Sequence, residues 1–253
     1  MAVHYERRGA SAVVTIDRQE RRNAVDGPTA EELTAAYRKF EADDDARVMI
    51  LTGAGGVAFC AGADLKNIES FGPRMDLPDG PLGFTRLTPS KPTIAAISGW
   101  CLAGGLELAL WCDLRVAARD ATFGVYCRRF GVPLMDLGTI RLPRLIGQSR
   151  AMDMILTGRG VSGEEAEQIG LANRLVEPGR ALAESLRVAH ELARLPQAAL
   201  RSDRRSVLEQ WSLDWDQATL NEFRLGIATV ATGETEAGAR RFAAGVGRHG
   251  KPV

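Results

Sequence analysis

The sequence predicts one large domain of the α/β class, with a tail made of helices alone. Apolar runs typical of strands alternate with amphipathic segments up to about Val176, and beyond Pro178 only helical periodicity is left. The chain has 253 residues, 45% of them hydrophobic, which is enough to bury a substantial core. We therefore expect a core in residues 1–178 and a helical region in residues 179–253, both within the same overall domain.

The first elements follow from the spacing of the apolar residues. Residues 10–17 and 48–51 predict buried strands. Residues 28–42 predict an amphipathic helix with an apolar face formed by Leu33, Ala36, Tyr37 and Phe40. Residues 71–89 are rich in proline and glycine, and they predict either a mobile loop near the entrance of a binding site or an irregular connection.

The tail carries large apolar side chains. Residues 180–195 and 196–213 predict two helices. Four aromatic side chains need to be buried somewhere, those of Trp211, Trp215, Phe223 and Phe242. The simplest expectation is that they pack against the chain's own core.

The charge and the cysteine content restrict the classes of partner that this protein is expected to bind. Lysine plus arginine equals aspartate plus glutamate at 32 each, so net charge gives no reason to bind nucleic acid or a membrane, and we expect a small-molecule substrate. The cysteines, Cys60, Cys101, Cys112 and Cys127, lack metal-binding spacing, so we expect no metal. No signal peptide or membrane-length apolar run is visible, which favours reduced thiols in a cytoplasmic protein.

Glu107 is the first candidate catalytic residue, because it lies in an otherwise apolar helical segment just after Gly104 and Gly105. Burial raises the pKa of a glutamate toward the range in which a carboxyl group can both take and give protons. The alternative is that Glu107 only bonds a backbone N–H of the first helical turn, as in a capping box. No Ser or Thr stands three residues earlier to complete that box.

Two glycine turns predict a pair of backbone donors. Residues 92–99 are typical of a strand and precede the glycine pair, so this turn directs free N–H groups of a helix N-terminus outward. Residues 47–53 are typical of a buried strand and precede a second glycine-rich turn, after which Asp64 and Leu65 begin a helical pattern. One N–H from each turn would make an oxyanion hole.

The same glycines fit nucleotide-binding motifs poorly. Residues 53–58 match a loose dinucleotide fingerprint, but residues 57–60 look extended, and no helix begins before Asp64 to receive a pyrophosphate. A P-loop is excluded because neither Gly-Lys-Ser nor Gly-Lys-Thr occurs in the chain.

Four motifs, in their order and spacing, resemble those of the enoyl-CoA hydratase/isomerase (crotonase) family. They are residues 56–65 (GVAFCAGADL), 91–96 (KPTIAA), 103–110 (AGGLELAL) and 157–173, which contains Thr-Gly, Gly-Glu-Glu-Ala and Gly-Leu-Ala-Asn. The resemblance runs from about Ala10 to beyond Val176. It implies a ClpP/crotonase-like spiral core of repeated ββα units and a C-terminal helical region that builds trimers, with pairs of trimers forming hexamers.

The resemblance also implies roles for named residues. The backbone N–H groups of Ala63 and Gly104 would bind the thioester carbonyl of an acyl-CoA and stabilise an enolate, with Glu107 as the acid/base residue. Coenzyme A is then part of the substrate, and no separate cofactor is expected.

The segment after the second glycine turn would line the entrance for coenzyme A. The resemblance implies this role for Ala61, Asp64, Leu65 and Lys66. For Asp64, a helix N-cap is an equal alternative.

One position departs from the family pattern. Family hydratases carry a second glutamate twenty residues after the first, and Cys127 occupies that position here. Either Glu107 acts alone or another acid reaches the site. Asp136 is the best candidate, since family isomerases place an acidic residue about one position earlier; its alternative is a loop or cap residue. Cys127 is either a small residue in the substrate pocket or a thiol nucleophile, although no recognisable histidine motif supports the latter.

The resemblance predicts an enoyl-CoA hydratase, which adds water reversibly to a 2-enoyl-CoA. The alternatives are an enoyl-CoA isomerase, which needs no activated water, and an acyl-CoA decarboxylase or hydrolase, which would use the same oxyanion hole. A hypothesis from a different class is an acyl-CoA-binding scaffold without activity. Glu107 argues against the scaffold, and Cys127 favours it.

Overall fold

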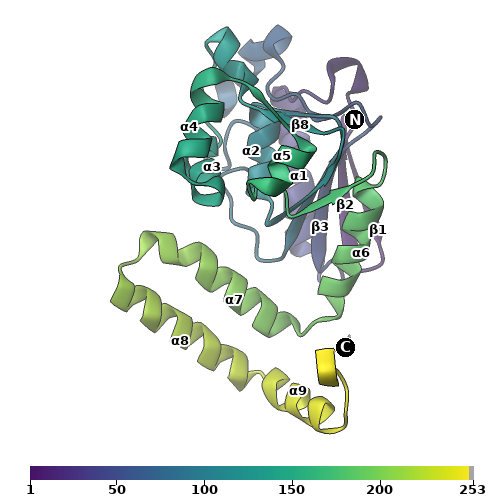
Figure 1. Cartoon of the computed structure of the whole chain (residues 1–253), viewed down its shortest axis with the longest axis vertical. Coiled ribbons are helices and arrows are strands. Elements are labelled where there is room, and N and C mark those ends of the chain that lie inside the picture. The colour runs from purple at the N-terminus through teal and green to yellow at the C-terminus, as the bar shows by residue number, and fades with distance from the viewer. Residues whose placement is uncertain (251–253) are drawn as a thin grey trace.

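The chain folds around two sheets of unequal size (Figure 1), and the computed structural model describes residues 1–250. The larger sheet has six strands, in the spatial order β1 (Val3–Arg8), β2 (Ser11–Ile16), β3 (Val48–Gly53), β5 (Thr93–Ile97), β7 (Leu114–Ala118) and β10 (Arg174–Val176). The smaller sheet has four, in the order β4 (Ala58–Cys60), β6 (Trp100–Leu102), β8 (Thr122–Gly124) and β9 (Gly160–Ser162). Only the β1–β2 and β8–β9 pairs are antiparallel.

Each turn of the chain adds one strand to each sheet. The strands β3, β5 and β7 are parallel neighbours in the larger sheet, and the strands that follow them, β4, β6 and β8, are parallel neighbours in the smaller one. A helical segment ends each turn, namely η2 (Leu65–Arg74), α2 (Gly104–Trp111), and η3 (Tyr126–Phe130) with α3 (Gly138–Ile146). The predicted spiral of ββα units is therefore confirmed. Because β4, β6 and β8 are parallel, the loops that follow them meet at one edge.

The remaining helical segments are α1 (Gly27–Ala42), α4 (Gln148–Thr157), α5 (Gly163–Gln168), α6 (Ala181–Arg194), α7 (Gln197–Glu209), α8 (Trp215–Ala231), α9 (Glu234–Ala243), η1 (Gln19–Arg21), η4 (Gln210–Ser212) and η5 (Arg248–Gly250). The predicted apolar face of α1 is buried as expected, and Asp26 caps its N-terminus by accepting the Thr29 N–H at 3.0 Å. Among the helices of residues 1–250, none combines the length and the apolar composition that a membrane crossing takes.

Two apolar clusters cover the two faces of the larger sheet. The larger cluster fills the space between this sheet, the smaller sheet, α1 and α2. On the other face, alternate residues of the strands, such as Val48, Ile50 and Ile94, pack against Val188 and Ala189 of α6. The helix α6 thus belongs to the packing of the core, and the part of the tail that stands apart begins with α7 (Figure 1).

The rest of the tail forms an arm of paired helices. Helices α7 and α8 lie side by side, apart from the body of the chain (Figure 1), and neither contains a buried residue. The four aromatic side chains of the tail are 56%, 84%, 65% and 60% exposed, for Trp211, Trp215, Phe223 and Phe242 in turn. The expectation that these side chains pack against the chain's own core is wrong, because all four are exposed; the ring of Trp211 contacts the edge of the body, where the guanidinium carbon of Arg144 of α3 lies 4.6 Å from the ring centre.

The segment after η2 is an irregular connection, as one of the two alternatives predicted. The helical turns of η2 extend to Arg74, beyond the expected start of the loop, and Pro73 lies inside them. No regular strand or helix follows until β5, yet Leu82, Phe84 and Thr85 in this segment are buried. Its interior is therefore part of the core packing.

Lys91 holds the end of α1 against the following turn. Its Nζ atom donates to the carbonyl oxygens of Phe40, Asp43 and Ala46 at 2.6, 2.8 and 3.1 Å. The residue is 3% exposed. A single ammonium group thus bonds three carbonyls at and just beyond the C-terminus of the helix. Those of Phe40 and Asp43 also accept a backbone N–H, whereas that of Ala46 has no other donor within residues 1–250.

We expect Lys91→Met to lower the free energy of unfolding by about 2–4 kcal/mol, because it removes three bonds from a charged donor and leaves the Ala46 carbonyl without a donor. Urea unfolding followed by circular dichroism measures this loss. The matched control is Lys39→Met, since Lys39 lies at the exposed side of the same helix and contacts the ring of Tyr5. Equal losses in the two variants would contradict the role assigned to Lys91.

Candidate active site

A cavity of about 1010 Å³ lies where the loops after β4, β6 and β8 meet. Its walls come from η2, the start of α2, η3 and residues 131–136. Of the site residues that the sequence predicted, all but Asp64 line this cavity. They are Ala61, Ala63, Leu65, Lys66, Gly104, Glu107, Cys127 and Asp136. The spiral therefore brings together residues from three successive turns of the chain.

Two backbone N–H groups are free to bind a ligand. On one side of the loop, the Gly62 carbonyl accepts the Val25 N–H, and the Asp64 N–H donates to the Val25 carbonyl. The N–H of Ala63, which lies between them, therefore points to the other side. The N–H of Gly104 is the first of α2. Within residues 1–250, neither N–H is donated to a protein acceptor. The close approach of the two turns is seen at Gly62, where an added Cβ would lie 2.9 Å from the Gly104 nitrogen.

A strained turn sets the direction of α2. Ala103, which precedes the helix, has φ 52° and ψ −119°, a conformation that residues with a Cβ rarely adopt. The helix then presses against β4, since a Cβ on Gly105 would lie 2.0 Å from the carbonyl oxygen of Cys60. The strain and the close packing together hold the helix N-terminus at the edge of the cavity.

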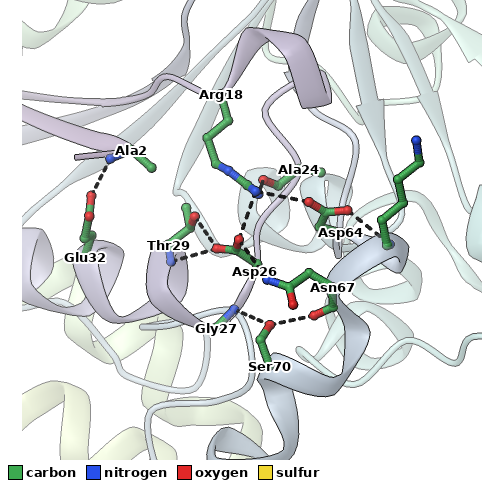
Figure 2. Close-up of polar contacts among 11 residues, drawn as sticks. Ala2, Arg18, Ala24, Asp26, Gly27, Thr29, Glu32, Asp64, Asn67 and Ser70 are labelled. Atoms are coloured by element: carbon green, nitrogen blue, oxygen red, sulfur yellow. Dashed lines mark hydrogen bonds and ion pairs between the residues drawn. The ribbon is translucent and has the colours of Figure 1, made fainter.

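Arg18 fixes the loop that carries Ala63 (Figure 2). Its guanidinium group pairs with the carboxylates of Asp26 and Asp64 at 2.9 and 3.1 Å. Asp64 also accepts the Lys66 N–H at 3.1 Å and caps η2. The N-cap alternative for Asp64 is thus confirmed, and its carboxylate lies outside the lining of the cavity because it faces Arg18.

Further contacts tie the start of α1 to η2. Asn67 donates to Asp26 at 3.3 Å, and the Ser70 hydroxyl donates to the Asn67 carbonyl at 2.6 Å (Figure 2). The same hydroxyl accepts the Gly27 N–H at 2.8 Å. This network holds the segment that follows Ala63 against the body of the protein.

The carboxyl group of Glu107 is buried and held by a neighbouring loop. The residue is 3% exposed, and its Oε1 atom accepts the N–H groups of Asp136 and Gly138 at 2.9 and 2.8 Å. Burial, followed by the nearby charge of Asp136, raises the pKa of Glu107 to about 7. The backbone bonds oppose this shift without cancelling it. The carboxyl group therefore exchanges protons near neutral pH.

Asp136 shares the cavity with Glu107. Its Oδ1 atom accepts the Leu82 N–H at 3.1 Å and the hydroxyl of Thr85. Burial raises the pKa of Asp136 above its usual value, while these two donors lower it. Leu137, with φ 71°, occupies the left-handed region, and this conformation lets the N–H groups on both sides of it point at Glu107.

Each of the two carboxyl groups keeps one oxygen for the cavity. The bonds described above occupy Oε1 of Glu107 and Oδ1 of Asp136. Within residues 1–250, Oε2 of Glu107 and Oδ2 of Asp136 have no hydrogen-bond partner. Neither atom is among the fully buried polar atoms without a partner, so both have surface exposed to solvent. Both oxygens are therefore accessible from the cavity, where they can take or give a proton.

Cys127 has the properties of a protonated thiol in the cavity wall. It is 7% exposed, and burial together with the charge of Glu107 raises the pKa of its thiol. The cavity lining contains no histidine that would act as a base. This geometry favours the packing role of Cys127 over the nucleophilic one, because a nucleophilic cysteine needs a lowered pKa.

Sequence reasoning missed four residues that shape the site. They are Arg18, Thr85, Ala103 and Leu137, which act through an ion pair, a hydrogen bond and two unusual backbone conformations. No local pattern signals any of them. Positive φ in particular is expected of glycine, and here an alanine and a leucine adopt it.

Two free N–H donors and two carboxyl groups thus line one cavity, an arrangement with the parts that oxyanion binding and proton transfer require. The sequence model of the family described as enoyl-CoA hydratase/isomerase matches residues 6–245. The chain belongs to this family, and it is an enzyme of the crotonase fold.

Its similarity to individual members extends over most of the chain. An enoyl-CoA hydratase of Mycobacterium tuberculosis is 34% identical over 245 residues, which cover 94% of this chain and 92% of that protein. A short-chain-enoyl-CoA hydratase of Clostridium acetobutylicum is 34% identical over 217 residues, covering 84% and 83%. The crystal structure of an enoyl-CoA hydratase from Mycobacterium marinum gives a TM-score of 0.91 at 36% identity, over 96% of both chains.

The raised pKa of Glu107 predicts a pH-dependent cost in stability. The folded protein holds this proton up to about pH 7, whereas the unfolded chain loses it near its ordinary value of 4.5. Stability therefore falls as pH rises from 4.5 to 7, and the full cost is present above pH 7. We expect Glu107→Gln to raise the free energy of unfolding by about 1–3 kcal/mol at pH 8 and by little at pH 5.

Urea unfolding at the two pH values measures this difference. Glu167→Gln is the matched control, since Glu167 is exposed on α5. A gain for Glu107→Gln that is equal at both pH values would rule out the proposed protonation.

Proposed function

We propose that this enzyme hydrates a 2-enoyl-CoA, and that Ala63, Gly104, Glu107 and Asp136 carry the reaction. The observation that supports it most directly is the pair of carboxyl groups, each with one oxygen open to the cavity, opposite two free backbone N–H groups. Hydration of a conjugated thioester needs these parts. One group takes a proton from water, another gives a proton to carbon, and donors stabilise the enolate oxygen in between.

The two N–H groups would bind the thioester carbonyl oxygen. The N–H of Gly104 begins α2, so the dipole of that helix adds to the stabilisation of a negative oxygen. The loop that holds Ala63 and the strained turn before Gly104 are both fixed by packing and ion pairs. Such donors lose little free energy in reorganising when charge develops on the substrate.

The two carboxyl groups would divide the proton transfers. Glu107, whose pKa is about 7, is the more readily protonated of the two and would give a proton to C2. Asp136, with two donors on Oδ1, would remain a carboxylate and take the proton of the water that attacks C3. Asp136 would thus supply the second carboxyl group, which family hydratases carry at the position of Cys127.

The outer end of the cavity suits coenzyme A. Ala61, Leu65 and Lys66 line it on the side of η2, with Arg22 close by, and both cationic side chains are exposed. Their charges would attract the phosphates of coenzyme A. We propose that coenzyme A enters as part of the substrate and that the reaction uses no other cofactor.

We also propose a homotrimer or a hexamer made of two trimers. The support is the arm of α7 and α8, whose large apolar side chains are exposed in the single chain. The four cysteines are free thiols, which agrees with the cytoplasmic location that we propose.

The central test is the loss of enoyl-thioester absorbance when the purified enzyme meets crotonyl-CoA, with the product identified by mass. We expect a water adduct, and kcat/KM that falls above about pH 7 as Glu107 loses its proton. Glu107→Gln lowers kcat by roughly 10²–10⁴-fold, because the proton donor is lost.

The outcomes separate the alternatives. A shifted double bond in place of a water adduct would identify an isomerase, and binding without reaction would identify a scaffold. A rate that rises through pH 7 would reverse the roles of the two carboxyl groups.

Asp136→Asn tests the second carboxyl group. We expect kcat to fall by about 10²–10³-fold with KM changed little, because the amide cannot take a proton from water. Initial rates with crotonyl-CoA measure it. Asp113→Asn is the control, since Asp113 bonds Thr93 away from the cavity. An undiminished rate in Asp136→Asn would leave Glu107 acting alone.

A further inference from the structure

A turn-rich segment, residues 79–86, lies directly behind Asp136. Its Leu82 N–H and its Thr85 hydroxyl both donate to the same oxygen, Oδ1. Thr85 is fully buried. The carboxylate of Asp136 is thus held from one side only, and the orientation of its free oxygen depends on where this segment lies.

Buried charges tie the segment to the core. Arg74 pairs with Asp79 at 3.2 Å, and it donates to the carbonyl oxygens of Gly80 and Pro81 at 3.1 Å each. Thr34 of α1 donates to Asp79 at 3.1 Å. Arg74 and Asp79 are 3% and 6% exposed, so this attachment is shielded from water.

Close packing and a second arginine hold Thr85 in contact with Asp136. Gly80 has φ 99°, and a Cβ there would lie 2.5 Å from the Thr85 hydroxyl oxygen and 3.1 Å from Oδ1 of Asp136. Arg141 of α3 donates to the Thr85 carbonyl at 2.8 Å. The hydroxyl group is therefore confined between the turn and the carboxylate.

We propose that Thr85 is a positioning residue, which holds one oxygen of Asp136 through its hydroxyl group so that the other oxygen faces the substrate. Residues 79–86 form the support that keeps Thr85 in place. The proposal rests on the role proposed above for Asp136. It assigns a part in the reaction to residues 79–86, which contact the carboxylate of Asp136 at Oδ1, the oxygen proposed not to face the substrate.

Several charged or titratable groups surround Asp136. Arg86 of the segment and Arg141 of α3 favour the carboxylate. Glu107 of α2 lies on the other side, linked through the Asp136 N–H, and Cys127 of η3 lines the same cavity. Of the donors to Oδ1, the Thr85 hydroxyl is the one that a side-chain substitution removes without changing these charges.

The test is Thr85→Val in the full chain, with kcat/KM for crotonyl-CoA measured against pH. Loss of the hydroxyl removes a bond to the charged form of Asp136, so its pKa rises. We expect the acidic limb of the profile to move up by about one pH unit, with KM changed less than about twofold. Thr85→Ser, which keeps the hydroxyl, returns the limb to its original place.

Two further variants separate a positioning role from a structural one. Thr93→Val removes a buried hydroxyl that donates to Asp113 at 3.1 Å, and it leaves the acidic limb unmoved. In the Asp136→Asn background, Thr85→Val has no additional effect on kcat. An acidic limb that stays in place in Thr85→Val, while Asp136→Asn is inactive, overturns the positioning role and leaves the proposed function intact. Full activity in Asp136→Asn overturns the positioning role of Thr85 together with the catalytic role proposed for Asp136.

Discussion

The carboxyl group of Glu107 lies inside an apolar helix, and the surrounding backbone is shaped by the need to bond it. Two N–H groups reach the same oxygen because Leu137 adopts a left-handed conformation between them. Gly138 has no Cβ, and one would lie 2.8 Å from the Glu107 side chain. The side chain of Glu107 thus positions the loop that carries Asp136. The two carboxyl groups are linked by a backbone hydrogen bond as well as by charge.

The two free N–H groups of Ala63 and Gly104 depend on a backbone conformation that costs free energy locally. The conformation of Ala103 costs about 1–3 kcal/mol for a residue other than glycine. It is maintained because α2 is buried on one side of it and Cys101 of β6 is buried on the other. On the other turn, Arg18 sits between two carboxylates and fixes the residue after Ala63. Rigid strands and buried ion pairs, rather than flexible side chains, therefore present the donors.

Much of the fold was predictable because it depends on local periodicity. The strands β2 and β3, the apolar face of α1 and the helix after Gly104 and Gly105 lie where the spacing of apolar residues indicated. Between β3 and Leu65 no helix begins, which agrees with the poor fit of this turn to a dinucleotide-binding motif. The extension of η2 past Pro73 and the exposed aromatic side chains of α8 departed from expectation, because neither follows from local periodicity.

The site was predictable where glycines and acids carry the signal. Glu107, Gly104 and Ala63 lie together, and Asp136 reaches them from a loop close to Cys127 in the chain. Their roles in the reaction stay predictions. Thr85 and Arg18 were not predictable, because their contacts join segments 46 to 51 residues apart. Such contacts follow from the spiral, and a reading of neighbouring residues does not show them.

The protonated state of the Cys127 thiol bears on whether the proposed substrate would alkylate the enzyme. A conjugated enoyl thioester is an electrophile, and a thiolate would add to its C3 atom and form a thioether. Burial and the charge of Glu107 both disfavour that thiolate. Under the proposed function, the carboxyl group that would transfer a proton would also, when charged, disfavour alkylation of the cavity wall, so a cysteine would be tolerated beside a reactive double bond.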